Sequence, residues 1–144
     1  SAEKVTRAAL FQGLNETDIN RILSIGTVKT YEPGDIIFKE GDDAVNIYFV
    51  EEGKLAVQSP DKQTLYTAQA GDVLGWSTLV LPYKRTATAV AQEKSKVIVI
   101  DQAKFHEFCE QNLPIGYKVT RNVGRMVATR MRTSKAMSAD MVYG

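Results

Sequence analysis

The residues with the clearest chemical potential lie in the middle of the chain, between a glycine turn and an arginine. Gly75 ends a short apolar run, and the Trp-Ser-Thr sequence after it has the pattern of the first turn of a short helix. Backbone N–H groups at the start of a helix bind anions, and an arginine such as Arg85 adds a charge-assisted, bidentate contact to a phosphate. The segment therefore predicts a phosphate site, with a surface arginine and a simple turn glycine as the alternative.

Two other residues could carry chemistry, and both are the only ones of their type. His106 and Cys109 lie three residues apart in an expected helix. No acidic residue is evident to orient the histidine, and a free cysteine is more often a buried, inert side chain. One histidine and one cysteine also exclude a zinc site built from these types. We expect no catalytic residues, no metal and no cofactor.

The elements that position the arginine are expected to be short strands between helices. Asn15 is a candidate cap for an amphipathic helix over about 16–24, with Asp18 in its first turn. After Gly26 the runs become rich in β-branched and aromatic residues and are separated by turn residues, which is typical of a sandwich or barrel. The strands predicted in this way are 27–31, 36–39, 46–51, 54–58, 64–68, 85–92 and 96–100.

Two helices are expected at the end of the chain. Asp101 is a good cap for the first, which reaches about Asn112, and Pro114 suits the first turn of the second. The second helix carries an apolar stripe of Val119, Val123, Met126, Val127 and Met131. Part of this stripe could pack on the β body, and the outer half could bury against a second copy of the chain, so we expect a homodimer.

The composition indicates one ordinary folded domain. The chain has 144 residues, of which 44% are hydrophobic and 24% are charged. No apolar run approaches the roughly 18 residues that span a bilayer, and no signal sequence is evident, so we expect a cytoplasmic protein without membrane contact. The last 31 residues carry six Lys and Arg against one acidic residue. We interpret these as a solvated helix face and expect no direct DNA binding.

Four sequence motifs follow the helix at 16–24: YEPGDIIFKEGD (31–42), IYFVEEG (47–53), GDVLG (71–75) and RTATA (85–89). Their order and spacing resemble those of the cyclic-nucleotide-binding domain family. The resemblance implies a mainly β fold, an eight-stranded antiparallel jelly roll (double-stranded β-helix), with an N-terminal helix and C-terminal helices. The domain would cover 8–134, with the roll at about 27–100, the helices at about 102–134, and a disordered tail at 135–144.

The resemblance also implies which residues contact the ligand, in a phosphate-binding cassette over 74–87. Arg85 would pair with the cyclic phosphate, the amides of Ser77 and Thr78 would point at the same group, and Gly75 would let the chain turn into the cassette helix. The ligand-binding residues predicted in this way are Gly75, Trp76, Ser77, Thr78, Arg85 and Thr86.

One position departs from the family pattern. Trp76, nine residues before Arg85, stands where the family has a glutamate that accepts the ribose 2′-hydroxyl. A hydrogen bond to a charged group is worth ~1.5–3 kcal/mol, so its loss implies roughly 10- to 150-fold weaker binding. The indole could stack on a ligand, fill the ribose site, or point into the core with Ser77 turned toward the ribose.

The expected function is a non-catalytic regulatory or sensor domain for a small anionic ligand, cAMP or cGMP. A residue near the start of the last helix, such as Tyr117, would close over the ligand and couple it to the C-terminal helices. The alternatives are a ligand-free dimerisation or protein-interaction module, and the sensor part of a catabolite-activator-type transcription regulator. A metal-dependent enzyme on a related β-roll is disfavoured by the single histidine.

Overall fold

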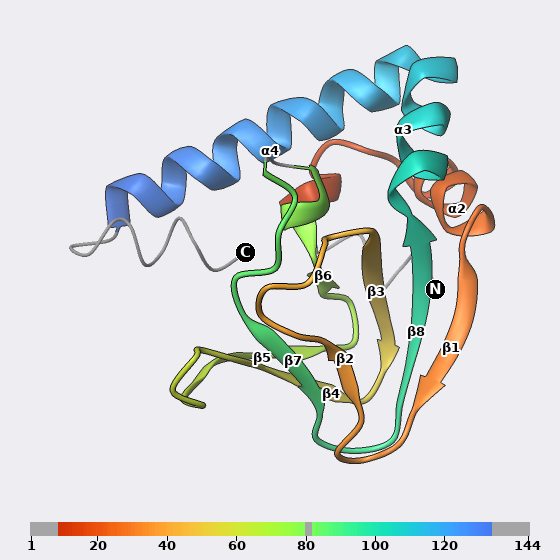
Figure 1. Ribbon diagram of the computed structural model, residues 1–144. Coiled ribbons are helices and arrows are strands. Elements are labelled where there is room, and N and C mark those ends of the chain that lie inside the picture. The colour runs from red at the N-terminus through yellow and green to blue at the C-terminus, as the bar shows by residue number, and fades with distance from the viewer. Residues whose placement is uncertain (1–8, 80–81, 134–144) are drawn as a thin grey trace.

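Eight antiparallel strands form two four-stranded sheets that make up the body of the molecule, seen in a computed structural model (Figure 1). The structure describes residues 9–79 and 82–133, with helical backbone alone for 129–133. One sheet has the order β1-β8-β3-β6 and the other the order β2-β7-β4-β5. The strands are β1 (Thr27–Tyr31), β2 (Ile36–Phe38), β3 (Asn46–Glu52), β4 (Lys54–Gln58), β5 (Thr64–Gln69), β6 (Val73–Leu74), β7 (Thr88–Ala91) and β8 (Ser95–Asp101). The predicted mainly β roll with flanking helices is confirmed.

Helical segments flank the roll and connect two of its strands. They are the 3-10 helices η1 (Ala9–Phe11) and η2 (Trp76–Leu79), and the α-helices α2 (Glu16–Ser24), α3 (Gln102–Gln111) and α4 (Leu113–Thr133). The start of α2 is a reciprocal capping box, because Asn15 accepts from the Asp18 amide and Asp18 accepts from the Asn15 amide. Asp101 likewise accepts from two amides in the first turn of α3. Both caps agree with the sequence prediction.

The strand that was expected to begin at Arg85 begins later. β7 starts at Thr88, and Arg85 lies in the connection before it. The Arg85 amide donates to the Asp42 carbonyl, and the Gly41 amide donates to the Arg85 carbonyl. These bonds tie the connection to the turn between β2 and β3. The β propensity of the residues after Arg85 led the sequence prediction to start the strand three residues too early. In the structure, Arg85 pairs with the turn between β2 and β3, and regular strand pairing begins only at Thr88.

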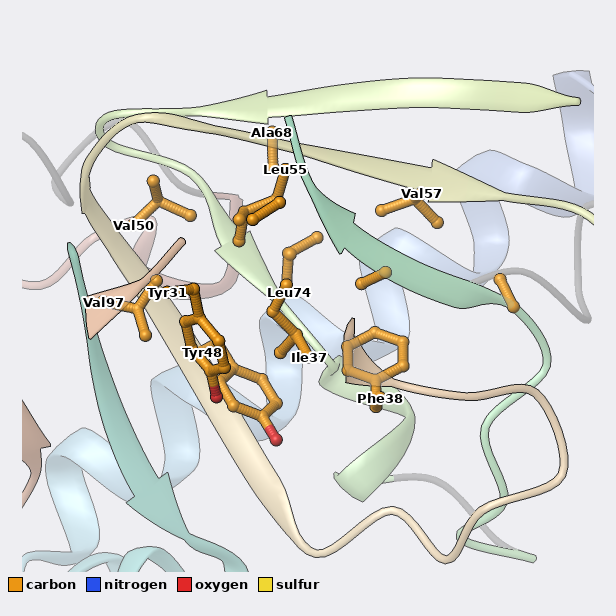
Figure 2. Close-up of a cluster of buried hydrophobic side chains, with 13 residues drawn as sticks. Tyr31, Ile37, Phe38, Tyr48, Val50, Leu55, Val57, Ala68, Leu74 and Val97 are labelled. Carbon is orange, nitrogen blue, oxygen red and sulfur yellow. The ribbon is translucent and has the colours of Figure 1, made fainter. Parts of the chain in front are cut away.

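The hydrophobic side chains form two clusters, one inside the roll and one under the helices. Figure 2 shows the first cluster, in which the aromatic rings of Tyr31, Phe38 and Tyr48 lie among aliphatic side chains such as Leu74. The second cluster joins η1, α2, α3 and α4 to the outer face of β3 and β8, and includes Phe11, Ile22, Phe49, Ile100 and Phe105. Burial of apolar surface at roughly 25 cal/mol per Å² is the main force holding the helices on the roll.

The apolar stripe of α4 covers this second cluster and is not a free dimerisation surface along its first half. Val119 is only 3% exposed, and Val123 and Met126 pack against the same cluster. Val127 is half-buried, and the side chain of Met131 lies outside the described part. The stripe is therefore satisfied largely within one chain. Homodimerisation stays a prediction.

Candidate ligand-binding site

The expected cassette lies between β6 and β7 and is built around a close approach of Gly75 and Arg85. Gly75 has a φ of +84°, which glycine adopts without the strain that a side chain would add. A Cβ at this position would lie 2.7 Å from Nη1 of Arg85 and 3.0 Å from the Asn46 carbonyl oxygen. Glycine is therefore required both by the turn and by the space that the guanidinium takes.

The Arg85 side chain points into the molecule and is 3% exposed. Nη1 donates to the Gly75 carbonyl at 3.0 Å and to Oγ of Ser77 at 3.1 Å. Nη2 donates to the Asn46 carbonyl. The groups that hold the guanidinium thus come from the start of β3, through Asn46, and from the turn after β6 and η2, through Gly75 and Ser77.

Aromatic rings from the first cluster form the wall on which the guanidinium lies. The Cζ atom of Arg85 is 4.3 Å from the centre of the Phe38 ring and 5.8 Å from that of Tyr48. Both rings lie inside the roll (Figure 2). A cation over an aromatic face gains roughly 0.5–2 kcal/mol. The rings therefore favour a positive charge at this place.

The guanidinium lacks an ion-pair partner within residues 9–79 and 82–128. Among the residues that the structure describes, Arg85 makes no ion pair, and its buried Nε has no hydrogen-bond partner. Burial lowers the pKa of the guanidinium below its ordinary value, with nearby Tyr48 and Asp42 acting in the opposite direction. The site therefore holds a buried cation with a donor to spare, which is the electrostatic arrangement that an anion would complete.

The two threonines of the expected site differ in their surroundings. The Thr78 amide donates to the Gly75 carbonyl at 3.0 Å inside η2, and its hydroxyl donates to the Asn46 carbonyl at 2.9 Å. In this conformation the Thr78 amide is therefore not directed at a ligand, in contrast to the expectation. The buried hydroxyl of Thr86, next to Arg85 in the chain, has no hydrogen-bond partner in the part of the chain that the structure describes.

Trp76 opens η2 and is buried, with 5% of its surface exposed. The indole is packed within the fold and does not offer an open platform in this conformation. Filling of the ribose position and packing into the core are the two interpretations that agree with this placement.

The structure does not bring Tyr117 to the cassette. Tyr117 is 66% exposed on α4, and Arg121 lies over its ring at 5.7 Å. Three other α4 residues, Val119, Thr120 and Val123, line a half-open cavity of about 500 Å³ together with Thr78 and Leu79 of η2. Tyr117 therefore lies in solvent in this conformation, and its closing over a ligand stays a prediction.

Asn46, Phe38 and Tyr48 are parts of the site that the sequence did not reveal. Asn46 contributes only its backbone oxygen, which every residue type possesses. The two aromatic residues belong to expected strands, and an aromatic ring in a buried strand is the only signal that could have pointed to them.

The other candidate residues do not form a reactive centre. Nε2 of His106 lies 2.9 Å from Glu110, and both side chains are exposed. Burial raises the pKa of the Cys109 thiol to about 11, so the nucleophilic thiolate is disfavoured. Within the described residues, no cluster of three or more His, Cys, Asp or Glu side chains could hold a metal ion. None of the described helices is long and apolar enough to cross a membrane.

Comparison with known families assigns the domain. The model of the cyclic nucleotide-binding domain matches residues 28–112, more than half of the chain and the whole of the roll except the first residue of β1. The chain belongs to the cyclic nucleotide-binding domain family.

Relatives with different overall architectures contain a similar region. Glutaminase 1 of Bradyrhizobium diazoefficiens is 28% identical over 127 residues, which cover 88% of this chain and 21% of the relative. The type II regulatory subunit of cAMP-dependent protein kinase from Drosophila melanogaster is 29% identical over 103 residues, 72% of this chain and 27% of the subunit. The chain thus spans about a fifth to a quarter of the length of these relatives.

Among solved structures, the catabolite activator protein of Thermus thermophilus is similar with a TM-score of 0.72 and 27% identity, over 86% of this chain and 58% of that one. The N-terminal domain of a transcriptional regulator from Streptomyces coelicolor has a TM-score of 0.78 at 23% identity, over 92% and 95% of the two chains, which shows the shared fold.

Proposed function

We propose that this domain is a regulatory module that binds a cyclic nucleotide, cAMP or cGMP, through Arg85. The observation that carries the proposal is the buried guanidinium without an ion pair among the described residues. Burying a charge without a partner costs several kcal/mol, so a fold that does so for no purpose is at a disadvantage. A cyclic phosphate would supply the missing negative charge.

In the ligand-free structure, Arg85 can exchange its carbonyl acceptors for phosphate oxygens at a small cost in free energy. Each carbonyl that accepts from Arg85 has a second donor, since Gly75 also accepts from the Thr78 amide and Asn46 from the Thr78 hydroxyl. Arg85 can therefore turn donors toward a phosphate while the Gly75 carbonyl keeps the Thr78 amide as its donor, and the Asn46 carbonyl keeps the Thr78 hydroxyl as long as η2 stays in place. Its unpartnered Nε and one Nη form the planar fork that fits two phosphate oxygens.

The ribose contributes less to binding than the phosphate in this proposal. A carboxylate is absent at position 76, where the indole is buried instead. No charged acceptor from that position is then available for the 2′-hydroxyl. We expect 2′-deoxy-cAMP to bind within about three-fold of cAMP, a difference well below the value of one hydrogen bond to a charged group.

The test is a thermal-shift titration with cAMP, cGMP, 2′-deoxy-cAMP and AMP, on wild type and Arg85→Met. A ligand at 100 times its dissociation constant adds about 2.7 kcal/mol to the free energy of unfolding, which is roughly 10 °C for a chain of this size. Losing two charge-assisted hydrogen bonds weakens binding by at least about 100-fold, so the variant should be stabilised by less than about 0.5 kcal/mol.

Two outcomes would contradict the proposal. A cyclic nucleotide that stabilises Arg85→Met as much as wild type would show that the phosphate does not bind at Arg85. No stabilisation of wild type by any of the four compounds at millimolar concentration would remove the nucleotide-sensor function. A dimer in sedimentation velocity would then favour the ligand-free interaction module.

A further inference from the structure

Access to Arg85 is closed in this structure, so an anion can reach the guanidinium only if a covering element moves. The side chain is 3% exposed, and its neighbours are the strand residues Phe38, Tyr48 and Asn46 and the first residues of η2. The strand residues belong to β2 and β3, which are paired within the sheets. The short helix η2 belongs to neither sheet and is the element that can move at the lowest cost.

Besides the bond from Arg85 to the Ser77 hydroxyl, two side-chain hydrogen bonds hold η2 in its closed position. The Thr78 hydroxyl donates to the Asn46 carbonyl at 2.9 Å, the same oxygen that accepts from Arg85. The amide of the Gln102 side chain donates to the Thr78 carbonyl at 2.6 Å. Thr78 is fully buried, and both bonds are at least partly shielded from water, which strengthens them relative to bonds at the surface.

The second bond connects η2 to the start of α3. Gln102 is the first residue of α3, and its backbone amide donates to the Val45 carbonyl at 2.8 Å, next to Asn46. Gln102 thus connects two elements. Its backbone binds the residue before β3, and its side chain binds η2. A displacement of η2 away from Arg85 must break the side-chain bond or pull the first turn of α3 with it.

We propose that Thr78 and Gln102 are positioning residues that latch η2 over Arg85, and that an anion binds only when this latch opens. The latch is inferred from hydrogen bonds of the ligand-free chain, whereas the identity of the anion rests on the proposed function. The latch stabilises the closed state alone, so it opposes binding through thermodynamic linkage. Weakening it should therefore raise affinity, the opposite of what loss of a purely structural hydrogen bond would do.

The first experiment measures opening without any ligand. Gln102→Met keeps the size of the side chain and removes its donor. Hydrogen exchange of the Thr78 amide, followed by NMR, should accelerate by about two- to ten-fold, the value of one net hydrogen bond. Gln111→Met is the matched control, because Gln111 lies at the exposed end of the same helix and its side chain donates to Glu107 on that helix. It should leave the exchange rate of Thr78 unchanged.

The second experiment measures cAMP affinity by calorimetry on the same variants. Gln102→Met should bind about two- to ten-fold more tightly than wild type, and Thr78→Val should shift affinity in the same direction. Gln111→Met should match wild type. Because one experiment needs no ligand, the latch and the proposed function can fail separately.

Each result decides a distinct point. Unchanged exchange at Thr78 in Gln102→Met would overturn the latch, as would cAMP affinity that falls or stays equal in that variant. If cAMP does not bind wild type at all, the proposed function fails, and the exchange rates alone support or overturn the latch. Equal acceleration of exchange throughout α4 would indicate general destabilisation and would also overturn it.

Discussion

Replacing Arg85 by methionine separates an arginine kept for a ligand from one kept for the fold. In the ligand-free chain the guanidinium makes three hydrogen bonds and lies over two aromatic rings. If these contacts were its purpose, removing them would be strongly destabilising. If the guanidinium is kept to bind an anion, its burial lowers the stability of the ligand-free protein. The methionine substitution would then remove this desolvation penalty.

The magnitude follows from the contacts. Three hydrogen bonds at about 1 kcal/mol each and the ring contact at about 1 kcal/mol contribute roughly 4 kcal/mol. Taking the guanidinium out of water without an ion pair costs several kcal/mol, a similar amount. The Gly75 and Asn46 carbonyls keep donors from Thr78, and a methionine side chain would pack between Phe38 and Tyr48. We expect Arg85→Met to change the free energy of unfolding by less than about 1 kcal/mol.

Urea denaturation of the ligand-free protein, followed by circular dichroism, measures this free energy. The slope with urea concentration should match wild type, which shows that the same surface is exposed on unfolding. Arg85→Ala is the comparison, because it leaves a cavity and should be less stable than Arg85→Met. A loss of more than about 2 kcal/mol in the methionine variant would refute the reasoning and identify Arg85 as a structural residue.

Three further predictions test the surroundings of the site. In thermal denaturation, Gly75→Ala should lower the free energy of unfolding by roughly 1–3 kcal/mol more than Gly34→Ala does. Both residues have positive φ, but of the two only Gly75 would bring a Cβ against other atoms. Equal losses in the two variants would contradict the close approach of Gly75 and Arg85. The Cys109 thiol, with its pKa raised from 9.0 to about 11, should react with a disulfide reagent at a rate that still rises between pH 9 and pH 10.5; a plateau near pH 9 would show an ordinary thiol. Val119→Ala should cost roughly 1–3 kcal/mol and leave the sedimentation coefficient unchanged, because this side chain is buried in the chain's own core; a change of oligomeric state without a change of stability would place it at an interface instead.

Local chemistry allowed much of the fold to be predicted from the sequence. The capping residues Asn15 and Asp101 begin helices as expected, since a cap depends on neighbours within three residues. The strand pattern, the glycine turn at position 75 and the motif order likewise led to the jelly roll and to the family. These features survive in the sequence because each one acts over a short stretch of chain.

The tertiary structure alone decided how the site is closed and what the last helix covers. The amphipathic stripe shows that α4 needs an apolar partner surface, but it does not identify that surface. In the structure the partner is the chain's own core, which buries Val119, while Tyr117 stays in solvent. The partners of Arg85 are largely backbone oxygens, and a carbonyl carries no side-chain signature. Their meeting depends on how β3 and β6 pair, a long-range contact that no local pattern encodes. The sequence by itself thus determined that a cation belongs to a turn in a β-roll, and packing determined that this cation is buried, unneutralised and latched.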